Sequence, residues 1–203
     1  MNDAALVLCG GFSKRMGEDK AHLPFGAATL IEHIVATVSG CVDEVWLVAR
    51  EGQAIPANER LGLPVARDPA SGEGPLAGLA AGLAAVRASQ AFVVSCDAPL
   101  VVPALIEGLL AIARRGAGAI PHVGGHYMTT CAVYGKTLLP EIERLLASQE
   151  RRPRVLAEQP GVAVVDEETV RRYDPDLRSF IDCNTRERYL EALELAGLSG
   201  SGT

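Results

Sequence analysis

Short apolar runs alternate along this 203-residue chain with segments whose apolar residues recur at helical spacing. Residues 4–8 and 91–95 are almost entirely apolar, which is typical of strands covered on both faces. Residues 29–39 and 104–115 place apolar residues three or four positions apart, which indicates helices that bury one side. This alternation predicts an α/β domain with a mostly parallel sheet and helices on both faces.

The rest of the chain continues the same alternation. Further strands are expected at 44–49, at 63–66, from 118 onward, at 129–134 and at 162–165, and further helices at 75–86, 138–147 and 185–196. Residues 179–184 are expected to form a last strand or a loop. Because neither an internal repeat nor a linker is evident, we predict one domain over residues 1–196 and a disordered tail at 197–203.

A glycine pair, Gly10-Gly11, follows the first apolar run, and the cations Lys14, Arg15 and Lys20 come soon after it. Glycines at a strand end let the backbone turn sharply with its N–H groups exposed, an arrangement that suits a phosphate. A polyanion would also neutralise the three cations. We interpret the stretch as a cradle for a triphosphate. The alternative is an ordinary turn with solvated side chains, because neither G-x-x-x-x-G-K-[ST] nor G-x-G-x-x-G occurs here.

Composition excludes several other classes of protein. The formal charge of −6 and the aromatic content of 4% argue against a nucleic-acid partner. No apolar segment reaches membrane-spanning length, and no basic region precedes the first apolar run, so neither a membrane span nor a signal peptide is expected. The five cysteines are widely spaced and odd in number. They fit small buried side chains in a reducing cytoplasm better than a zinc site or a disulfide framework.

Asp97 is the leading candidate for a metal ligand. It follows the apolar run at 91–95, where a carboxylate is either a solvated strand-end residue or an oxygen ligand for Mg²⁺ that bridges substrate phosphates. Asp68 closes another predicted strand. In sheets of this kind the ligand crevice lies outside the carboxyl ends of the strands. We therefore expect the opening loop, Asp68 and Asp97 to share one crevice.

Four strings in this sequence resemble those of one enzyme family. Residues 8–20, L-C-G-G-F-S-K-R-M-G-E-D-K, resemble the G-G-x-S-x-R-M-G-x-D-K signature of the nucleotidyltransferases of molybdenum-cofactor maturation. G-P-L-A-G at 74–78, C-D-A-P-L at 96–100 and D-C-N-T at 182–185 resemble the molybdenum cofactor guanylyltransferases in the same order. The resemblance implies a single-domain, Rossmann-like nucleotidyltransferase fold.

The resemblance also implies an activity and its partners. Such an enzyme transfers GMP from Mg-GTP to the phosphate of molybdopterin (the molybdenum cofactor), releasing pyrophosphate and forming the guanine dinucleotide cofactor. Molybdenum-insertion proteins and recipient oxidoreductases are implied as further partners.

Carried over position by position, the resemblance implies roles for individual residues. Those expected to bind the nucleotide are Leu8, Cys9, Gly10, Gly11, Ser13, Lys20, Arg50, Asp68, Gly74, Pro75, Leu76, Gly78 and Asp97. Arg15, Lys20 and Asp97 are expected to be catalytic, and Asp97 to bind Mg²⁺. Asp182 and Asn184 are expected to bind the acceptor.

The chain departs from the family pattern near the acceptor residues. Family members commonly have Asn at the position of Asp182, and Thr-Pro-Glu-Asp where this chain reads Thr-Arg-Glu-Arg at 185–188. The added carboxylate either supplies a second metal ligand or disfavours a phosphorylated acceptor. Three alternatives stay open: a related enzyme that uses CTP and shares the opening signature, an enzyme that activates another phosphorylated acceptor, and a non-catalytic GTP-binding adaptor. The presence of both Lys20 and Asp97 argues against the adaptor.

The predicted helix at 75–86 is rich in small residues. Gly78 and Gly82 each cost about 1 kcal/mol of helix propensity relative to Ala. Either they allow close packing of the helix on the sheet, or they make room for a flat ligand at the start of the helix. The sequence leaves both interpretations open.

Overall fold

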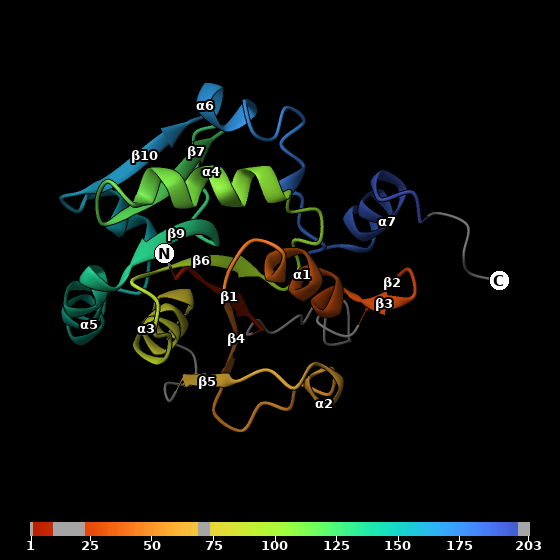
Figure 1. Cartoon of the computed structure of the whole chain (residues 1–203), viewed down its shortest axis with the longest axis horizontal. Coiled ribbons are helices and arrows are strands. Elements are labelled where there is room, and N and C mark those ends of the chain that lie inside the picture. The colour runs from red at the N-terminus through yellow and green to blue at the C-terminus, as the bar shows by residue number, and fades with distance from the viewer. Residues whose placement is uncertain (1, 10–22, 69–73, 199–203) are drawn as a thin grey trace.

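The computed structural model describes residues 2–9, 23–68 and 74–198, and its centre is a mixed sheet with the strand order β10-β7-β9-β6-β1-β4-β5 (Figure 1). These strands are β1 (Ala4–Leu8), β4 (Glu44–Arg50), β5 (Val65–Asp68), β6 (Gln90–Ser95), β7 (Gly118–Val123), β9 (Cys131–Gly135) and β10 (Val162–Asp166). Along this path only β9 runs against the others, because it pairs antiparallel with both β6 and β7. The prediction of a mostly parallel sheet is therefore confirmed.

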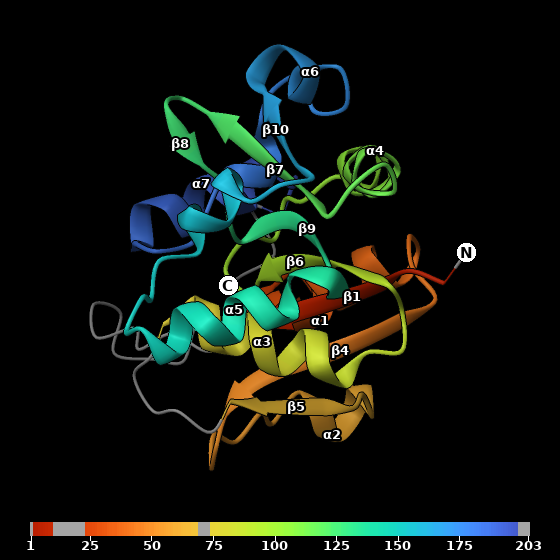
Figure 2. The same cartoon turned by 90° about the vertical axis from the view of Figure 1, so that its left-hand side faces the viewer.

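Helices cover both faces of this sheet, as the sequence predicts (Figure 1). The longer helices are α1 (Leu30–Ser39), α3 (Pro75–Ala85), α4 (Pro103–Ala113), α5 (Leu139–Ala147) and α7 (Arg186–Leu195), and the short ones are α2 (Asn58–Leu61) and α6 (Glu167–Arg171). α1 and α4 pack on one face, and α3 and α5 pack on the other, in front of the strands in Figure 2. No helix in the described ranges is both long and apolar enough to cross a membrane.

Alternation along β1 shows how one short strand serves both faces. Ala5 and Val7 pack into the cluster under α1 and α4, whereas Leu6 and Leu8 pack into the cluster under α3 and α5. Successive side chains of a strand point to opposite faces, so a strand buried on both sides has to be apolar throughout. Every residue of β1 is buried for this reason.

Several short elements escape prediction from the sequence. β2 (Pro24–Phe25) and β3 (Ala28–Thr29) form a small antiparallel hairpin, and β8 (His126–Tyr127) pairs with the end of β7. The segment 179–184 is no strand. It begins in the short 3₁₀ helix Arg178–Phe180 and continues as an irregular loop. Other 3₁₀ turns span Lys136–Leu138 and Pro153–Glu158.

A third, smaller hydrophobic cluster joins the β2–β3 hairpin to α7. Phe25, Cys183 and Ala192 are buried in it, and Leu198 packs against it. Leu198 belongs to the stretch 197–203 that the sequence suggests is a disordered tail, so order extends at least one residue past Gly197. The division of the chain into one domain and a tail stays a prediction.

The small residues of α3 serve close packing on the sheet. A Cβ atom at Gly82 would stand 2.6 Å from a Leu6 methyl group and 3.1 Å from a Val48 methyl group. At Gly78 the nearest atom, also on Val48, would be 3.4 Å away, which is an ordinary contact. Of the two interpretations of this helix, close packing is therefore the one that the structure supports at Gly82.

Four of the five cysteines, all except Cys41, are buried, as the sequence suggests. Burial, with a smaller contribution from the negative charge of Asp174, raises the pKa of the Cys131 thiol. A raised pKa keeps a thiol protonated and unreactive at neutral pH. Cys131 therefore behaves as a small apolar side chain.

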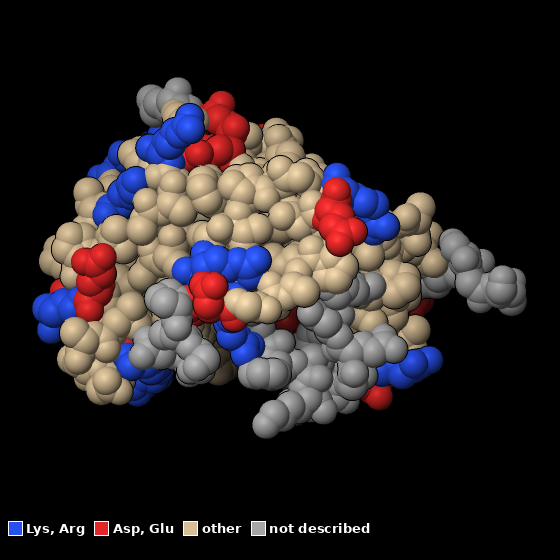
Figure 3. Space-filling model, turned by 90° about the horizontal axis from the view of Figure 1, so that it is seen from below, with Lys and Arg blue, Asp and Glu red and all other residues tan. Residues whose placement is uncertain are grey.

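Basic and acidic side chains alternate on the described part of the face that carries β5 and α2 (Figure 3). Elsewhere arginines also pair with nearby acids, as Arg144 does with Glu141 and Arg152 with Glu150. Exposed pairs of this kind contribute little to stability because water screens them. An anionic ligand on such a surface has to be bound by a local group of residues.

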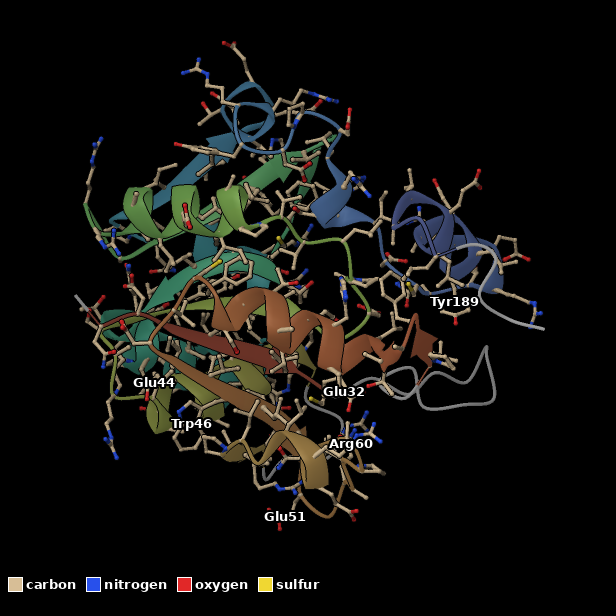
Figure 4. All side chains as sticks on the ribbon, turned by 45° about the vertical axis from the view of Figure 1, so that its right-hand side comes forward. Glu32, Glu44, Trp46, Glu51, Arg60 and Tyr189 are labelled. Atoms are coloured by element: carbon tan, nitrogen blue, oxygen red, sulfur yellow. The ribbon has the colours of Figure 1, made fainter. Side chains whose placement is uncertain are left out.

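α1 begins with a capping box. The Thr29 hydroxyl accepts a hydrogen bond from the Glu32 N–H, and the Glu32 carboxylate accepts one from the Thr29 N–H at 2.8 Å. Arg60 on α2 donates to the same carboxylate at 2.7 Å, and Figure 4 shows the two side chains meeting between the helices. The Arg60 guanidinium first, then the N–H and hydroxyl of Thr29, lower the pKa of Glu32 from 4.5 to about 2.

We expect Glu32→Gln to lower the free energy of unfolding by about 1 kcal/mol at pH 7, the usual size of a capping contribution. Because the folded pKa of Glu32 lies below the unfolded value, its contribution is present above pH 4.5 and is lost as the pH falls toward 2. Urea unfolding at pH 7, 4 and 2.5 should therefore show the difference between wild type and variant shrinking. Glu191→Gln, on an exposed face of α7, is the control. If the difference in unfolding free energy between wild type and Glu32→Gln did not vary with pH, this account would be contradicted.

Candidate functional site

The carboxyl ends of four parallel strands meet at one edge of the sheet. Leu8 of β1 pairs with Val48 of β4 on one side and with Ser95 of β6 on the other. Arg50 pairs with Asp68 at the ends of β4 and β5. The edge thus presents, in order, the segment after β6, the segment after β1, and the last residues of β4 and β5. The predicted crevice residues Cys9, Asp68 and Asp97 lie along this edge, as the sequence suggests.

The strand that ends at Asp68 differs from the prediction in its bounds. β5 begins at Val65 rather than Leu63, and it ends at Asp68 rather than at residue 66. Asp68 is buried, and its carbonyl accepts a hydrogen bond from the Glu51 N–H at 3.0 Å. The position of Asp68 at the edge is therefore fixed by β4 on one side.

Cys9 is held at both of its backbone groups. Its N–H donates to the Val48 carbonyl at 2.8 Å, which continues the ladder between β1 and β4 by one residue. Its carbonyl accepts a hydrogen bond from the Gln53 side-chain amide at 2.8 Å. The chain therefore leaves β1 in a fixed direction.

α3 starts against the same edge of the sheet. Gly74 precedes the helix with φ +78° and ψ −172°, a conformation that glycine adopts most readily. Pro75 takes the first helical position, where its missing N–H costs little. Leu76 is buried, and a Cβ at Gly78 would lie 3.4 Å from Val48 and 3.9 Å from Leu8. The first turn of α3 thus lies beside β1 and β4 at Gly78, whereas a Cβ at Gly74 would lie 3.5 Å from the Arg151 carbonyl oxygen.

A pocket of about 210 Å³ opens at the other end of the edge, beside Asp97. Its walls come from the end of β6, the segment before β9 and the loop after the 3₁₀ helix Arg178–Phe180. Its lining residues are Ser95, Asp97, Ala98, Met128, Thr130, Cys131, Ser179, Phe180, Asp182 and Asn184. The Cys183 N–H donates to the Asp97 carbonyl at 2.7 Å and ties the loop to β6. Asp97 therefore shares one pocket with Asp182 and Asn184.

Arg188 stands beside the carboxylate that distinguishes this chain from the family pattern. Its guanidinium lies 3.6 Å from Asp182, and the Asn184 N–H donates to the same carboxylate oxygen at 3.2 Å. Both Asp182 and Arg188 are departures from the pattern, and they have opposite charges. The positive charge of Arg188 partly offsets the negative charge of Asp182 beside the pocket.

Two residues that shape this loop, Asp174 and Ser179, escape prediction as such from the sequence. Asp174 is buried and accepts hydrogen bonds from the Ser179 N–H at 2.8 Å and from the Arg178 N–H at 3.1 Å. The Ser179 hydroxyl in turn accepts one from the Val102 N–H at 3.0 Å. The sequence Asp174-Pro175 is a turn signal that could have predicted the turn at this position.

The residues expected to hold phosphate lie outside the described ranges. They are Gly10, Gly11, Ser13, Arg15 and Lys20. Their predicted roles stay predictions.

Two carboxylates, Asp97 and Asp182, line the pocket at the end of β6. Within the described residues, no three or more His, Cys, Asp or Glu side chains form a group able to hold a metal ion. Mg²⁺ in phosphate-transfer sites is commonly bound through one or two carboxylates, with substrate phosphates and water completing its shell. The donor set around Asp97 fits a magnesium ion that arrives with a nucleotide.

Comparison with curated proteins finds relatives over most of the chain. A probable molybdenum cofactor guanylyltransferase of Mycobacterium avium is 38% identical over 164 residues, which cover 77% of this chain and 81% of that protein. One of Methanosarcina mazei is 34% identical over 196 residues, covering 91% and 87% of the two chains.

Solved structures with the same fold cover nearly the whole chain. Molybdopterin-guanine dinucleotide biosynthesis protein A of Archaeoglobus fulgidus superposes with a TM-score of 0.82 at 26% identity, covering 96% of this chain and 98% of that one. The 2-C-methyl-D-erythritol 4-phosphate cytidylyltransferase of Thermus thermophilus reaches a TM-score of 0.70 at 19% identity over 95% and 98% of the chains, which shows a shared fold.

Residues 5–164 match the family model described as the MobA-like NTP transferase domain. That match takes in β1, β4, β5 and β6, the four strands whose ends form the candidate site, and runs on into β10. The chain belongs to the MobA-like NTP transferase family and is a nucleotidyltransferase.

Proposed function

We propose that this enzyme transfers GMP from Mg-GTP to the phosphate of molybdopterin, releases pyrophosphate and so forms the guanine dinucleotide cofactor. The observation that carries the proposal is the position of Asp97. It stands at the sheet edge that also holds Cys9, Arg50 and Asp68, and it lines the pocket that holds Asp182 and Asn184. Relatives named as molybdenum cofactor guanylyltransferases span most of the same chain.

GTP would bind along the ends of β1, β4 and β5. In this arrangement Leu8, Cys9, Arg50 and Asp68 contact the nucleoside, and the start of α3 at Gly74 closes one side. Gly10, Gly11 and Ser13 cradle the triphosphate, and Lys20 and Arg15 neutralise it. Backbone N–H groups and cations are the usual partners of phosphate oxygens in proteins.

The chemistry asks for little covalent help from the protein. The acceptor phosphate is already ionised at neutral pH, so no general base is needed. The barrier is the approach of two anions and the further charge that develops on the leaving pyrophosphate. Asp97 would hold Mg²⁺, which when bound offsets negative charge on the triphosphate. Lys20 and Arg15 would offset the rest and keep the two phosphates aligned.

Molybdopterin would enter the pocket beside Asp97. Asp182 and Asn184 line that pocket, and Arg188 balances the charge of Asp182. The pocket also contains Met128 and Phe180, apolar side chains suited to part of an organic ring. Molybdenum-insertion proteins and recipient oxidoreductases would take the product, in the cytoplasm.

We expect pyrophosphate release by the purified protein to require molybdopterin and Mg²⁺ and to be at least tenfold faster with GTP than with CTP, ATP or UTP. The measurement is a coupled pyrophosphate assay with each nucleotide in turn, and Lys20→Ala should reduce the rate about a hundredfold. Release with CTP alone would overturn the choice of GTP. Binding is tested separately: if the protein binds Mg-GTP tightly but releases no pyrophosphate with molybdopterin or with any other phosphorylated acceptor, the non-catalytic adaptor is favoured.

A further inference from the structure

A four-residue turn after β4 contacts every strand end on the proposed nucleotide side. It runs from Arg50 to Gln53 and is closed by a hydrogen bond from the Gln53 N–H to the Arg50 carbonyl at 3.1 Å. Gly52, with φ +72°, supplies the left-handed backbone that such a turn needs. The Glu51 N–H donates to the Asp68 carbonyl on β5 at 3.0 Å. Figure 4 shows Glu51 at the outer margin of the molecule, below β4.

Gln53 joins this turn to the end of β1. The side-chain oxygen of Gln53 accepts a hydrogen bond from the Arg50 N–H at 3.2 Å, and its amide nitrogen donates to the Cys9 carbonyl at 2.8 Å. A peptide group is planar, so a hydrogen bond on its carbonyl fixes the orientation of the whole group. One amide side chain therefore fixes the backbone of two proposed nucleotide-binding residues, Cys9 and Arg50.

Arg67 holds the turn from β5. One nitrogen of its guanidinium donates to the Gln53 carbonyl at 2.6 Å and to the Arg50 carbonyl at 3.0 Å. Arginine is suited to this task because its planar group presents several donors in a fixed arrangement. The bonds form a continuous path from Arg67 through the backbone and side chain of Gln53 to Cys9.

We infer that Gln53 is a positioning residue for the nucleotide and that Arg67 supports it. The inference rests on the proposed function, because it takes Cys9 and Arg50 to contact GTP. Gln53 acts through the Cys9 carbonyl and the Arg50 N–H, so its loss changes how well these groups are aligned for binding. Binding should therefore suffer more than turnover at saturating nucleotide.

Gln53→Glu is the sharpest test, since it keeps the size of the side chain and the acceptor oxygen but replaces the donor to Cys9 with a second oxygen. We expect the Kd for Mg-GTP, measured by calorimetry on the full chain, and the KM for GTP to rise about tenfold, which corresponds to about 1.4 kcal/mol. The kcat should stay within about threefold of wild type. The unfolding midpoint without nucleotide should stay within about 2 °C.

Two further variants complete the design. Arg67→Lys keeps the charge but loses the planar group that fixes the direction of the donors, so KM should rise about threefold. Gln159→Glu makes the same chemical change as Gln53→Glu just before β10, at the opposite edge of the sheet, and should leave Kd, KM and kcat unchanged.

The outcomes separate this inference from the proposed function. If Gln53→Glu leaves Kd and KM unchanged, the positioning role alone is overturned. The same holds if the variant has a lower unfolding midpoint and a lower kcat at unchanged KM, because a merely structural residue behaves in this way. Wild type that binds CTP in place of GTP overturns the guanine assignment, and a tenfold rise with CTP for Gln53→Glu would still support the positioning role. Wild type that binds no nucleotide overturns both.

Discussion

Asp97→Asn is expected to reduce pyrophosphate release with GTP and molybdopterin by a hundredfold to about a thousandfold. The exchange removes the charge with which Asp97 would hold Mg²⁺ between nucleotide and acceptor, while it keeps the size of the side chain. Loss of one charge-stabilising contact in a transition state typically costs this much. The measurement is the initial rate at saturating substrates, compared at low and high Mg²⁺.

Asp43→Asn is the matched control for this variant. Asp43 precedes β4 at the amino edge of the sheet, where its carboxylate accepts a hydrogen bond from the Asp3 N–H at 3.0 Å. An asparagine oxygen can accept the same bond, so rate and stability should match wild type. If Asp97→Asn kept more than a tenth of the wild-type rate, Asp97 would not be the metal ligand, and the proposed placement of the reaction would fail.

Gly116→Ala should cause the largest loss of stability among Gly→Ala substitutions at the described glycines. Gly116 lies between α4 and β7, and a Cβ there would stand 2.1 Å from the Gly161 carbonyl oxygen. That oxygen accepts a hydrogen bond from the Ala117 N–H at 2.6 Å, so it cannot move away without breaking the start of the β7–β10 pairing. Overpacking against backbone atoms lowers the free energy of unfolding by about 3 kcal/mol. For a chain of this size we expect the unfolding midpoint to fall by about 6–12 °C.

Gly40→Ala separates this steric effect from the general effect of adding a methyl group. Gly40 caps α1 with φ −75°, and a Cβ there would meet only the Thr37 carbonyl oxygen at 3.5 Å, an ordinary contact. The unfolding midpoint of Gly40→Ala should stay within about 2 °C of the wild-type midpoint, measured by scanning calorimetry as for Gly116→Ala. Equal midpoints for Gly116→Ala and Gly40→Ala would show that the α4–β7 connection has more freedom than its geometry indicates.

Local patterns predicted the elements of the fold because each leaves a mark within a few residues. The uninterrupted apolar runs at β1 and β6 indicated strands buried on both faces, and Pro75 marked the start of α3. Strand direction left no such mark. The apolar pattern of β9 is the same whether it runs with or against its neighbours, so its reversal was open until its pairings with β6 and β7 were known.

The candidate site was predictable where a strand end or a family motif pointed to it. Asp97 and Asp68 followed from strand ends, and Asp182 and Asn184 from one short string. Gln53 could not be found in this way, because its partner Cys9 lies 44 residues earlier in the chain. Gly82 shows the same limit: its two interpretations could be separated only once Leu6 was known to lie beneath it.

The residues proposed to bind the two substrates lie in different parts of the sequence because β9 runs in the reversed direction. Because β9 begins at the edge where the other strands end, Met128 and Thr130 join the pocket with the loop 178–184, whereas the residues proposed to bind GTP, apart from Asp97, all come before position 79. On the proposed function, donor and acceptor preferences would be encoded in different segments of the sequence, with Asp97 between them. A substitution in the second half of the chain would then alter the choice of acceptor while the hydrogen bonds among Cys9, Gln53 and Arg67 stay in place, and the two preferences would be free to evolve independently.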